Sequence, residues 1–117
     1  MLQQGWQVPF LLLSVATATC VGAAEKEVFQ QQVLFRSGTE KTHTFRIPAL
    51  LRTGKGTVLI FCEARRESGR DHSNIDLVMK RSPDGGRTWG KMRVLADDGP
   101  HAMGNPCAVV DSKTGTI

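Results

Sequence analysis

Arg46 is the residue whose type and setting point most directly to chemistry. It stands between two apolar residues, Phe45 and Ile47, an arrangement that would hold a guanidinium firmly in a strand. A planar, permanently charged guanidinium can hold a carboxylate through two parallel hydrogen bonds. Taken by itself, the pattern favours an ordinary surface arginine beside a proline, Pro48, that edges a strand. Arg46 is therefore a candidate anion-binding residue whose role depends on its context.

Asp71 carries a carboxyl group in a polar segment, six residues after Arg65. A carboxyl group that acts as a general acid must hold a proton when substrate binds, and burial by the substrate raises its pKa in that direction. By itself, the segment favours a solvated turn aspartate. Arg66, Glu67 and Arg70 lie in the same stretch, and residue type alone does not distinguish them from Arg65 and Asp71.

Short apolar runs separated by turn signals must position these residues. No stretch after residue 25 keeps a helical period over three turns, and Ile75, Leu77 and Met79 alternate with more polar neighbours, as in a strand with one apolar face. The expected strands are residues 28–35, 45–51, 57–64, 74–82, 91–95 and 105–110. Evenly spaced short strands with hairpin turns predict an all-β antiparallel fold: a sandwich, a barrel or a propeller.

The stretch "SPDGGRTW", residues 82–89, has the composition of a tight turn. Asp84 can accept hydrogen bonds from turn amides, two glycines can adopt positive φ, and the tryptophan can bury its ring under the turn. The pattern Ser-x-Asp-x-Gly-x-Thr-Trp is met by Ser82, Asp84, Gly86, Thr88 and Trp89. We assign these residues structural roles. The stretch "GKGT", residues 54–57, is likewise a hairpin turn, because it lacks the leading glycine of a phosphate-binding loop.

Composition excludes several classes of function. The formal net charge of the 117 residues is +4, but basic residues are interspersed with acidic ones and few aromatics lie beside them, so nucleic acid is not an expected partner. His43, His72 and His101 are far apart and lack cysteine or carboxylate neighbours at metal-ligand spacing. We therefore expect no metal and no cofactor.

The N-terminus predicts a secretory signal peptide over residues 1–24. An apolar core, residues 8–16, precedes small residues suited to cleavage, and an uncleaved membrane anchor is the alternative because no Lys or Arg precedes that core. The remaining domain would span residues 25–117. Its Cys62 and Cys107 can form a disulfide or remain free thiols, and the sequence does not choose between these. A secretory destination is expected: secreted, lysosomal, periplasmic or at the cell surface.

The motifs together resemble the exo-alpha-sialidase (neuraminidase) family. The stretch "FRIP" is followed in order by "FCEARRESGRD", by the turn pattern above, which is that family's Asp box, and by "GNPC". The resemblance covers about residues 35–117 and implies the N-terminal portion of a six-bladed β-propeller, about one and a half blades, from a longer protein. The Asp box also occurs in non-enzymatic propellers, and in the family it lies on the side away from substrate.

The resemblance also implies a function, the hydrolysis of terminal sialic acids on glycoproteins, glycolipids and oligosaccharides with retention of configuration. Sialylated glycans would be the partners, and a membrane would be met only through substrate or an uncleaved N-terminal segment. The implied roles are carboxylate binding for Arg46, pocket binding for Arg65, orientation of these cations by Glu63, acid/base catalysis for Asp71, and N-acetyl binding for Asn105 and Pro106.

Part of the family's machinery is missing from the sequence. Sialidases use a tyrosine nucleophile, whose proton a nearby glutamate can take, and the chain contains no Tyr. That tyrosine, its glutamate and two further arginines would have to lie in later blades, so the chain alone is expected to be inactive. A non-catalytic Asp-box propeller that binds glycans or protein, and a trans-sialidase, are the alternatives.

Overall fold

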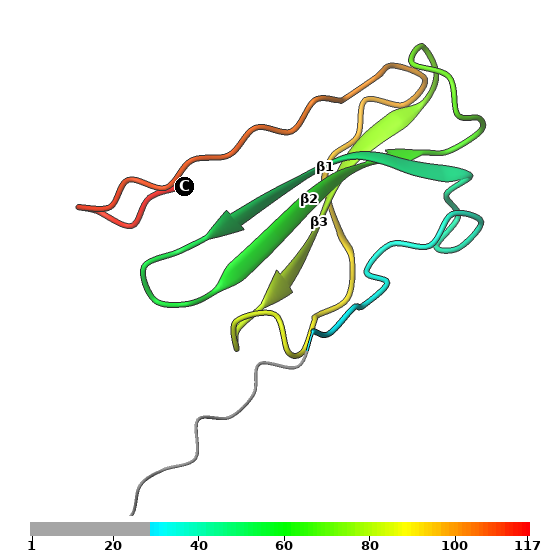
Figure 1. Cartoon of the computed structure of the whole chain (residues 1–117). Coiled ribbons are helices and arrows are strands. Elements are labelled where there is room, and N and C mark those ends of the chain that lie inside the picture. Colours follow the sequence, from blue (N-terminus) through cyan, green and yellow to red (C-terminus); the bar gives the residue numbers. More distant parts are fainter. Residues whose placement is uncertain (1–28) are drawn as a thin grey trace, which may run out of the picture. The chain divides into compact units, whose positions relative to one another are not determined.

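The computed structural model describes residues 29–117, and the predicted signal peptide lies outside them. Four strands form one antiparallel sheet in chain order: β1 Thr44–Arg52, β2 Val58–Arg65, β3 Ile75–Ser82 and β4 Arg93–Ala96. The first three lie side by side in Figure 1. This confirms the all-β antiparallel prediction. A four-stranded up-and-down sheet is the repeating unit of a β-propeller. No helix in the described residues is long and apolar enough to cross a bilayer.

Both faces of the sheet are covered, which explains why β2 is almost entirely buried. Successive side chains of a strand point to opposite faces, so two apolar clusters form. One cluster contains Leu59, Phe61 and Met79; the other contains Cys62, Ala64 and Val78. β2 has side chains buried on both faces, and its sequence begins with a continuous apolar run, residues 58–62, whereas β3 alternates more.

Two of the six expected strands do not form in the described residues: the prediction was wrong for residues 29–35, the described part of the first run, and for residues 105–110. The described part of the first run, residues 29–35, is extended without ladder pairing, yet Phe35 packs on Phe45 at 5.0 Å between ring centroids. The later run also lacks ladder pairing, although Ala108 packs against the cluster of Leu59. An apolar run becomes a strand only where another strand offers its hydrogen-bonding groups, and no described strand does so here. The described part of the chain therefore contains a single sheet, made of β1 to β4.

The β1–β2 connection is the hairpin turn that "GKGT" predicts. The amide of Thr53 donates to the carbonyl of Thr57 at 2.9 Å, and the amide of Gly56 donates back to Thr53 at 3.0 Å. Gly56 has φ of +82°, which a residue without Cβ adopts without strain. The turn joins the ends of β1 and β2 that lie away from Arg46.

The Asp-box turn is held by its own polar side chains. Thr88 donates to both carboxylate oxygens of Asp84, from its amide at 2.9 Å and its hydroxyl at 2.7 Å. The hydroxyl of buried Ser82 donates to the same carboxylate at 2.7 Å and accepts from the amide of Gly86 at 2.8 Å. Trp89 is half-buried, and its ring nitrogen donates to the carbonyl of Gly86. The hydrogen bonds from Thr88, and then the one from Ser82, lower the pKa of Asp84 below its usual range.

The register of the sheet places the Asp box far from the candidate site residues. Ser82 pairs with Val58 at one end of the β2–β3 ladder, while Arg65 pairs with Ile75 at the other end. The Asp box follows Ser82, and the loop that carries Asp71 joins Arg65 to Ile75. The turn therefore lies at the opposite end of the sheet from that loop.

Candidate active site

A polar cavity of about 400 Å³ opens at the end of the sheet where β2 passes into β3. It collects side chains from β1, β2, the β2–β3 loop and the segment after β4. Its lining consists of Arg46, Ile47, Glu63, Arg65, Asp71, Ile75, Ala102, Gly104 and Asn105. Five of the six residues predicted to bind or convert substrate therefore meet in one place. The sixth, Pro106, follows Asn105 directly but does not line this cavity.

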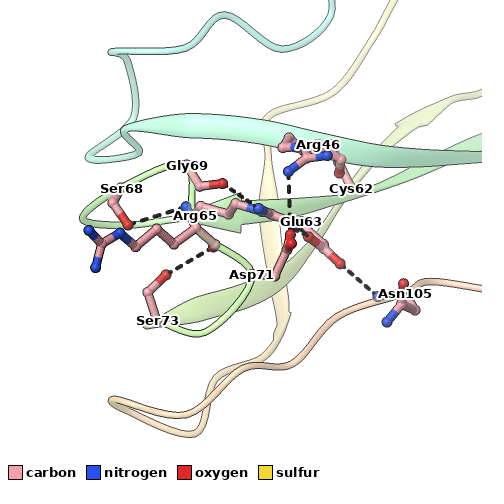
Figure 2. Close-up of polar contacts among 10 residues, drawn as sticks. Arg46, Cys62, Glu63, Arg65, Ser68, Gly69, Asp71, Ser73 and Asn105 are labelled. Carbon is pink, nitrogen blue, oxygen red and sulfur yellow. Dashed lines mark hydrogen bonds and ion pairs between the residues drawn. The ribbon is translucent and has the colours of Figure 1, made fainter.

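Arg65 forms the buried wall of the cavity. Its side chain is only 2% exposed, and its Nε and Nη2 atoms donate to Oε2 of Glu63 at 3.0 and 2.7 Å (Figure 2). Its Nη1 donates to the carbonyl of Gly69 at 2.6 Å, and this bond ties the β2–β3 loop to the strand. Burial alone would lower the pKa of Arg65, but the hydrogen bonds and charges of Glu63 and Asp71 raise it above its usual value.

Arg46 is the accessible cation of the cavity. Its side chain is 47% exposed, and its Nη1 donates to Oδ1 of Asp71 at 3.3 Å. Arg46 pairs across the ladder with Glu63, so both side chains lie on the same face of the sheet. The guanidinium of Arg65 already has three hydrogen bonds, whereas Arg46 makes one long contact. Arg46 can therefore donate hydrogen bonds to an incoming anion, whereas the guanidinium of Arg65 already donates to Glu63 and Gly69.

Asp71 lies between the two arginines, as Figure 2 shows. Its Oδ1 is 2.7 Å from Nη2 of Arg65 and 3.3 Å from Nη1 of Arg46. The hydrogen bond and charge of Arg65 lower the pKa of Asp71 below its usual range, and the charges of Arg46 and His72 act in the same direction. In this state Asp71 is an ionised carboxylate at the cations, where an anionic ligand would compete with it.

Glu63 joins the strand to the segment after β4. While Oε2 accepts from Arg65, Oε1 accepts from the backbone amide of Asn105 at 2.9 Å. The segment is aligned by Ile75, whose carbonyl accepts from the amide of Met103 at 2.8 Å. The hydrogen bonds of the Glu63 carboxylate thus go to Arg65 and to the Asn105 amide, and none goes to Arg46.

Arg66, Glu67 and Arg70 are not lining residues of the cavity. Arg66 lies on the other face of the sheet, where its guanidinium binds the buried carboxylate of Asp76, with an Nε–Oδ2 distance of 2.7 Å. Asp76 pairs across the ladder with Ala64, whose side chain lies on the face opposite that of Arg65. The alternation of a strand thus assigns Arg65 to the cavity and Arg66 to a structural ion pair.

Two lining features escaped the sequence reasoning. Ile47 has φ of +54° within a β-bulge, and no sequence signal announces such a conformation in a β-branched residue. Gly104 lies so close to Glu63 that an added Cβ would be 2.6 Å from Oε1. A glycine beside "NPC" was a usable signal for that close approach.

Two sequence expectations concern metals and disulfides. Within residues 29–117, no three His, Cys, Asp or Glu side chains gather in a way that suits a metal ion. In the same part of the chain, Cys62 is a buried free thiol and Cys107 an exposed one. Of the two alternatives that the sequence left open, a disulfide or two free thiols, the structure has the free thiols.

Comparison with known proteins places this geometry in a family. No family model matches the chain. An exo-alpha-sialidase of Arthroderma benhamiae is 45% identical over 78 residues, which cover 62% of this chain and 19% of the relative. A sialidase of Micromonospora viridifaciens is 31% identical over an alignment that covers 94% of this chain and 20% of the relative. The chain belongs to the exo-alpha-sialidase family.

Solved sialidase structures share the fold. The Hadza microbial sialidase Hz136 is 33% identical, with a TM-score of 0.62 over 68% of this chain and 17% of that protein. The NanB sialidase of Streptococcus pneumoniae, in complex with 2-[(3-chlorobenzyl)ammonio]ethanesulfonate, is 28% identical with a TM-score of 0.54 over 70% of this chain. The four-stranded sheet is therefore part of a sialidase propeller. The chain spans about a fifth of the length of its curated sialidase relatives.

Proposed function

We propose that the complete gene product, of which this chain is all or part, is an exo-alpha-sialidase that releases terminal sialic acids from glycoproteins, glycolipids and oligosaccharides. The observation that carries the proposal is the cavity in which Arg46, Arg65 and Asp71 meet. Sialic acid bears a carboxylate on its anomeric carbon, and a guanidinium is the side chain best suited to hold a carboxylate in a fixed orientation. The sialidase names of the relatives support the same activity.

In this proposal Arg46 binds the substrate carboxylate, and Arg65 forms the wall behind it. The exposed guanidinium of Arg46 has one contact at 3.3 Å to lose, so a ligand carboxylate can replace Asp71 at little cost. Arg65 keeps its bonds to Glu63 and Gly69 throughout. Asn105 and Pro106 contribute to the pocket for the N-acetyl group. The backbone amide of Asn105 is held by its hydrogen bond to the carboxylate of Glu63.

Asp71 acts in the proposal as the acid on the glycosidic oxygen and then as the base on the attacking water. Its lowered pKa in the free protein keeps it ionised, which is the wrong form for an acid. When a substrate carboxylate takes its place at Arg46, Asp71 loses a cation and gains an anionic neighbour. Both changes raise the pKa of Asp71, since a nearby negative charge disfavours ionisation. Substrate binding therefore favours uptake of a proton from solvent by Asp71, and this is the proton that the first step needs.

The nucleophile comes from outside this chain, because the chain contains no Tyr. In the retaining mechanism that we propose, a tyrosine gives its proton to a nearby glutamate and attacks the anomeric carbon, while Asp71 protonates the departing glycosidic oxygen. Water then attacks the anomeric carbon of the sialyl-enzyme, Asp71 takes a proton from that water, and the tyrosine leaves with the proton held by the glutamate. The secretory destination predicted from residues 1–24 would bring such an enzyme to sialylated glycans.

Arg46→Lys tests the proposal in the complete gene product. A lysine keeps the charge but not the planar fork, so kcat/KM on a fluorogenic sialoside should fall at least about tenfold, as expected for loss of a charge-assisted hydrogen bond. Arg52→Lys is the matched control, because Arg52 is an exposed arginine of the same strand that does not line the cavity. Equal activity of the two variants would refute the role of Arg46.

The same assay separates the alternatives. A wild-type protein that binds sialosides but releases no sialic acid would be a glycan-binding propeller without catalysis. One that forms a new sialoside when lactose is added as acceptor would be a trans-sialidase. Release of free sialic acid that lactose does not divert is the result we expect.

A further inference from the structure

The backbone around Arg46 has an unusual conformation. Between Arg46 and Ala49 the β1–β2 register shifts, so that Ile47 and Pro48 together oppose one residue of β2, Cys62. This is a β-bulge, a device that redirects a strand and its side chains. Ile47 has φ of +54°, in a region that β-branched residues rarely adopt and that persists only when surrounding contacts impose it. The bulge therefore needs an external support.

Cys62 supplies a contact at this point. Its side chain is 2% exposed, and its Sγ donates to the carbonyl oxygen of Arg46 at 3.0 Å (Figure 2). Pro48 has no backbone N–H, so the bulge has one donor fewer with which to secure itself. The thiol is thus a side-chain donor at the first peptide of the bulge.

The thiol is itself well anchored. Cys62 packs with Ala64 and Val78 in the apolar cluster on the face of the sheet opposite the cavity. Burial raises the pKa of Cys62 to about 11, although backbone hydrogen bonds at Glu63 and Arg46 act in the opposite direction. The sulfur therefore keeps its proton at physiological pH, as a hydrogen-bond donor must.

We propose that Cys62 is a positioning residue for Arg46: its S–H bond to the Arg46 carbonyl, made from the core face, sets the bulge that directs the guanidinium into the cavity. The peptide after Arg46 determines where the Cα–Cβ bond of Arg46 points. A bond to that carbonyl from one face therefore controls a side chain on the other. The consequence for catalysis rests on the proposed function of Arg46, whereas the support of the bulge does not.

Three variants of the complete gene product test this. Cys62→Ala removes the donor, Cys62→Ser keeps a donor of similar size, and Val78→Ala removes more volume from the same buried cluster without a bond to Arg46. Hydrogen exchange at the amides of Ile47 and Ala49 is the first readout. We expect faster exchange in Cys62→Ala, restored protection in Cys62→Ser, and wild-type protection at these amides in Val78→Ala.

The second readout is sialoside turnover. Because Arg46 would hold the carboxylate in both ground and transition states, its misplacement should raise KM about three- to tenfold with little change in kcat, the range that one lost hydrogen bond produces. Cys62→Ser should restore KM, and Val78→Ala should leave it unchanged. If Cys62→Ala leaves amide protection unchanged, or if Val78→Ala exposes the same amides equally, the positioning role is wrong. If the wild type releases no sialic acid, the proposed function fails while the exchange data still decide the role of Cys62.

Discussion

Replacement of Glu63 is the most direct test of how the cavity is held together. The carboxylate is 4% exposed and joins two elements: it accepts two hydrogen bonds from Arg65, itself 2% exposed, and one from the amide of Asn105. In Glu63→Ala the guanidinium of Arg65 stays buried without its main counter-ion. Glu67→Ala is the matched control, because Glu67 is exposed and does not line the cavity.

The size of the effect follows from what remains around Arg65. Breaking a buried ion pair by removing one partner costs about 3–5 kcal/mol. Arg65 would keep its bond to the Gly69 carbonyl and its 2.7 Å contact with Asp71, so we place the loss at the lower end, about 3 kcal/mol. The freed amide of Asn105 adds little, since Asn105 is exposed and water can accept its hydrogen bond.

The free energy of unfolding of the complete gene product, measured with urea, is the appropriate assay. Glu63→Gln separates charge from volume: it fills the same space, but its amide nitrogen cannot accept a hydrogen bond. We expect Glu63→Gln to be nearly as unstable as Glu63→Ala, and Glu67→Ala to lie within about 0.5 kcal/mol of the wild type. A Glu63→Gln protein as stable as the wild type would refute the argument that the charge of Glu63 holds Arg65.

Two further predictions concern the same cavity. Gly104→Ala places a Cβ 2.6 Å from Oε1 of Glu63 and should lower thermal stability and raise KM, whereas Gly54→Ala, whose Cβ meets nothing within 4 Å, should change neither. Binding of sialic acid should take up protons at mildly acidic pH, because the ligand raises a pKa of Asp71 that Arg65 and Arg46 had lowered. Calorimetry in two buffers of different ionisation enthalpy measures this uptake, and proton release would contradict the scheme.

The strands that were predicted correctly are those with both an apolar pattern and a neighbour. Residues 75–82 alternate in the sequence and pair with β2 over their whole length. Residues 105–110 are equally apolar but have no ladder partner among the described strands, and they stay extended. Local pattern reports which residues favour burial, whereas strand formation also needs a second strand at hydrogen-bonding distance.

The sequence allowed a prediction of which residues lie together, but not of their contacts. The family resemblance of "FRIP" and "FCEARRESGRD" singled out Arg46, Arg65 and Asp71, and all three line one cavity. The sequence did not reveal that Asp71 occupies the position at the arginines that an anion would take. It also did not reveal that Glu63 bonds to Arg65 and the Asn105 amide rather than to Arg46.

Residue types and their order along the chain determined an antiparallel all-β fold, an Asp-box turn and a set of cationic and acidic candidates. The tertiary structure decided which candidates work together. Strand alternation sends Arg65 into the cavity and leaves Arg66 to pair with Asp76 on the other face. The bulge at Ile47 and the thiol of Cys62 set the path of the backbone at Arg46. Such contacts join residues distant in sequence, and they exist only when the sheet has brought opposite strands into register.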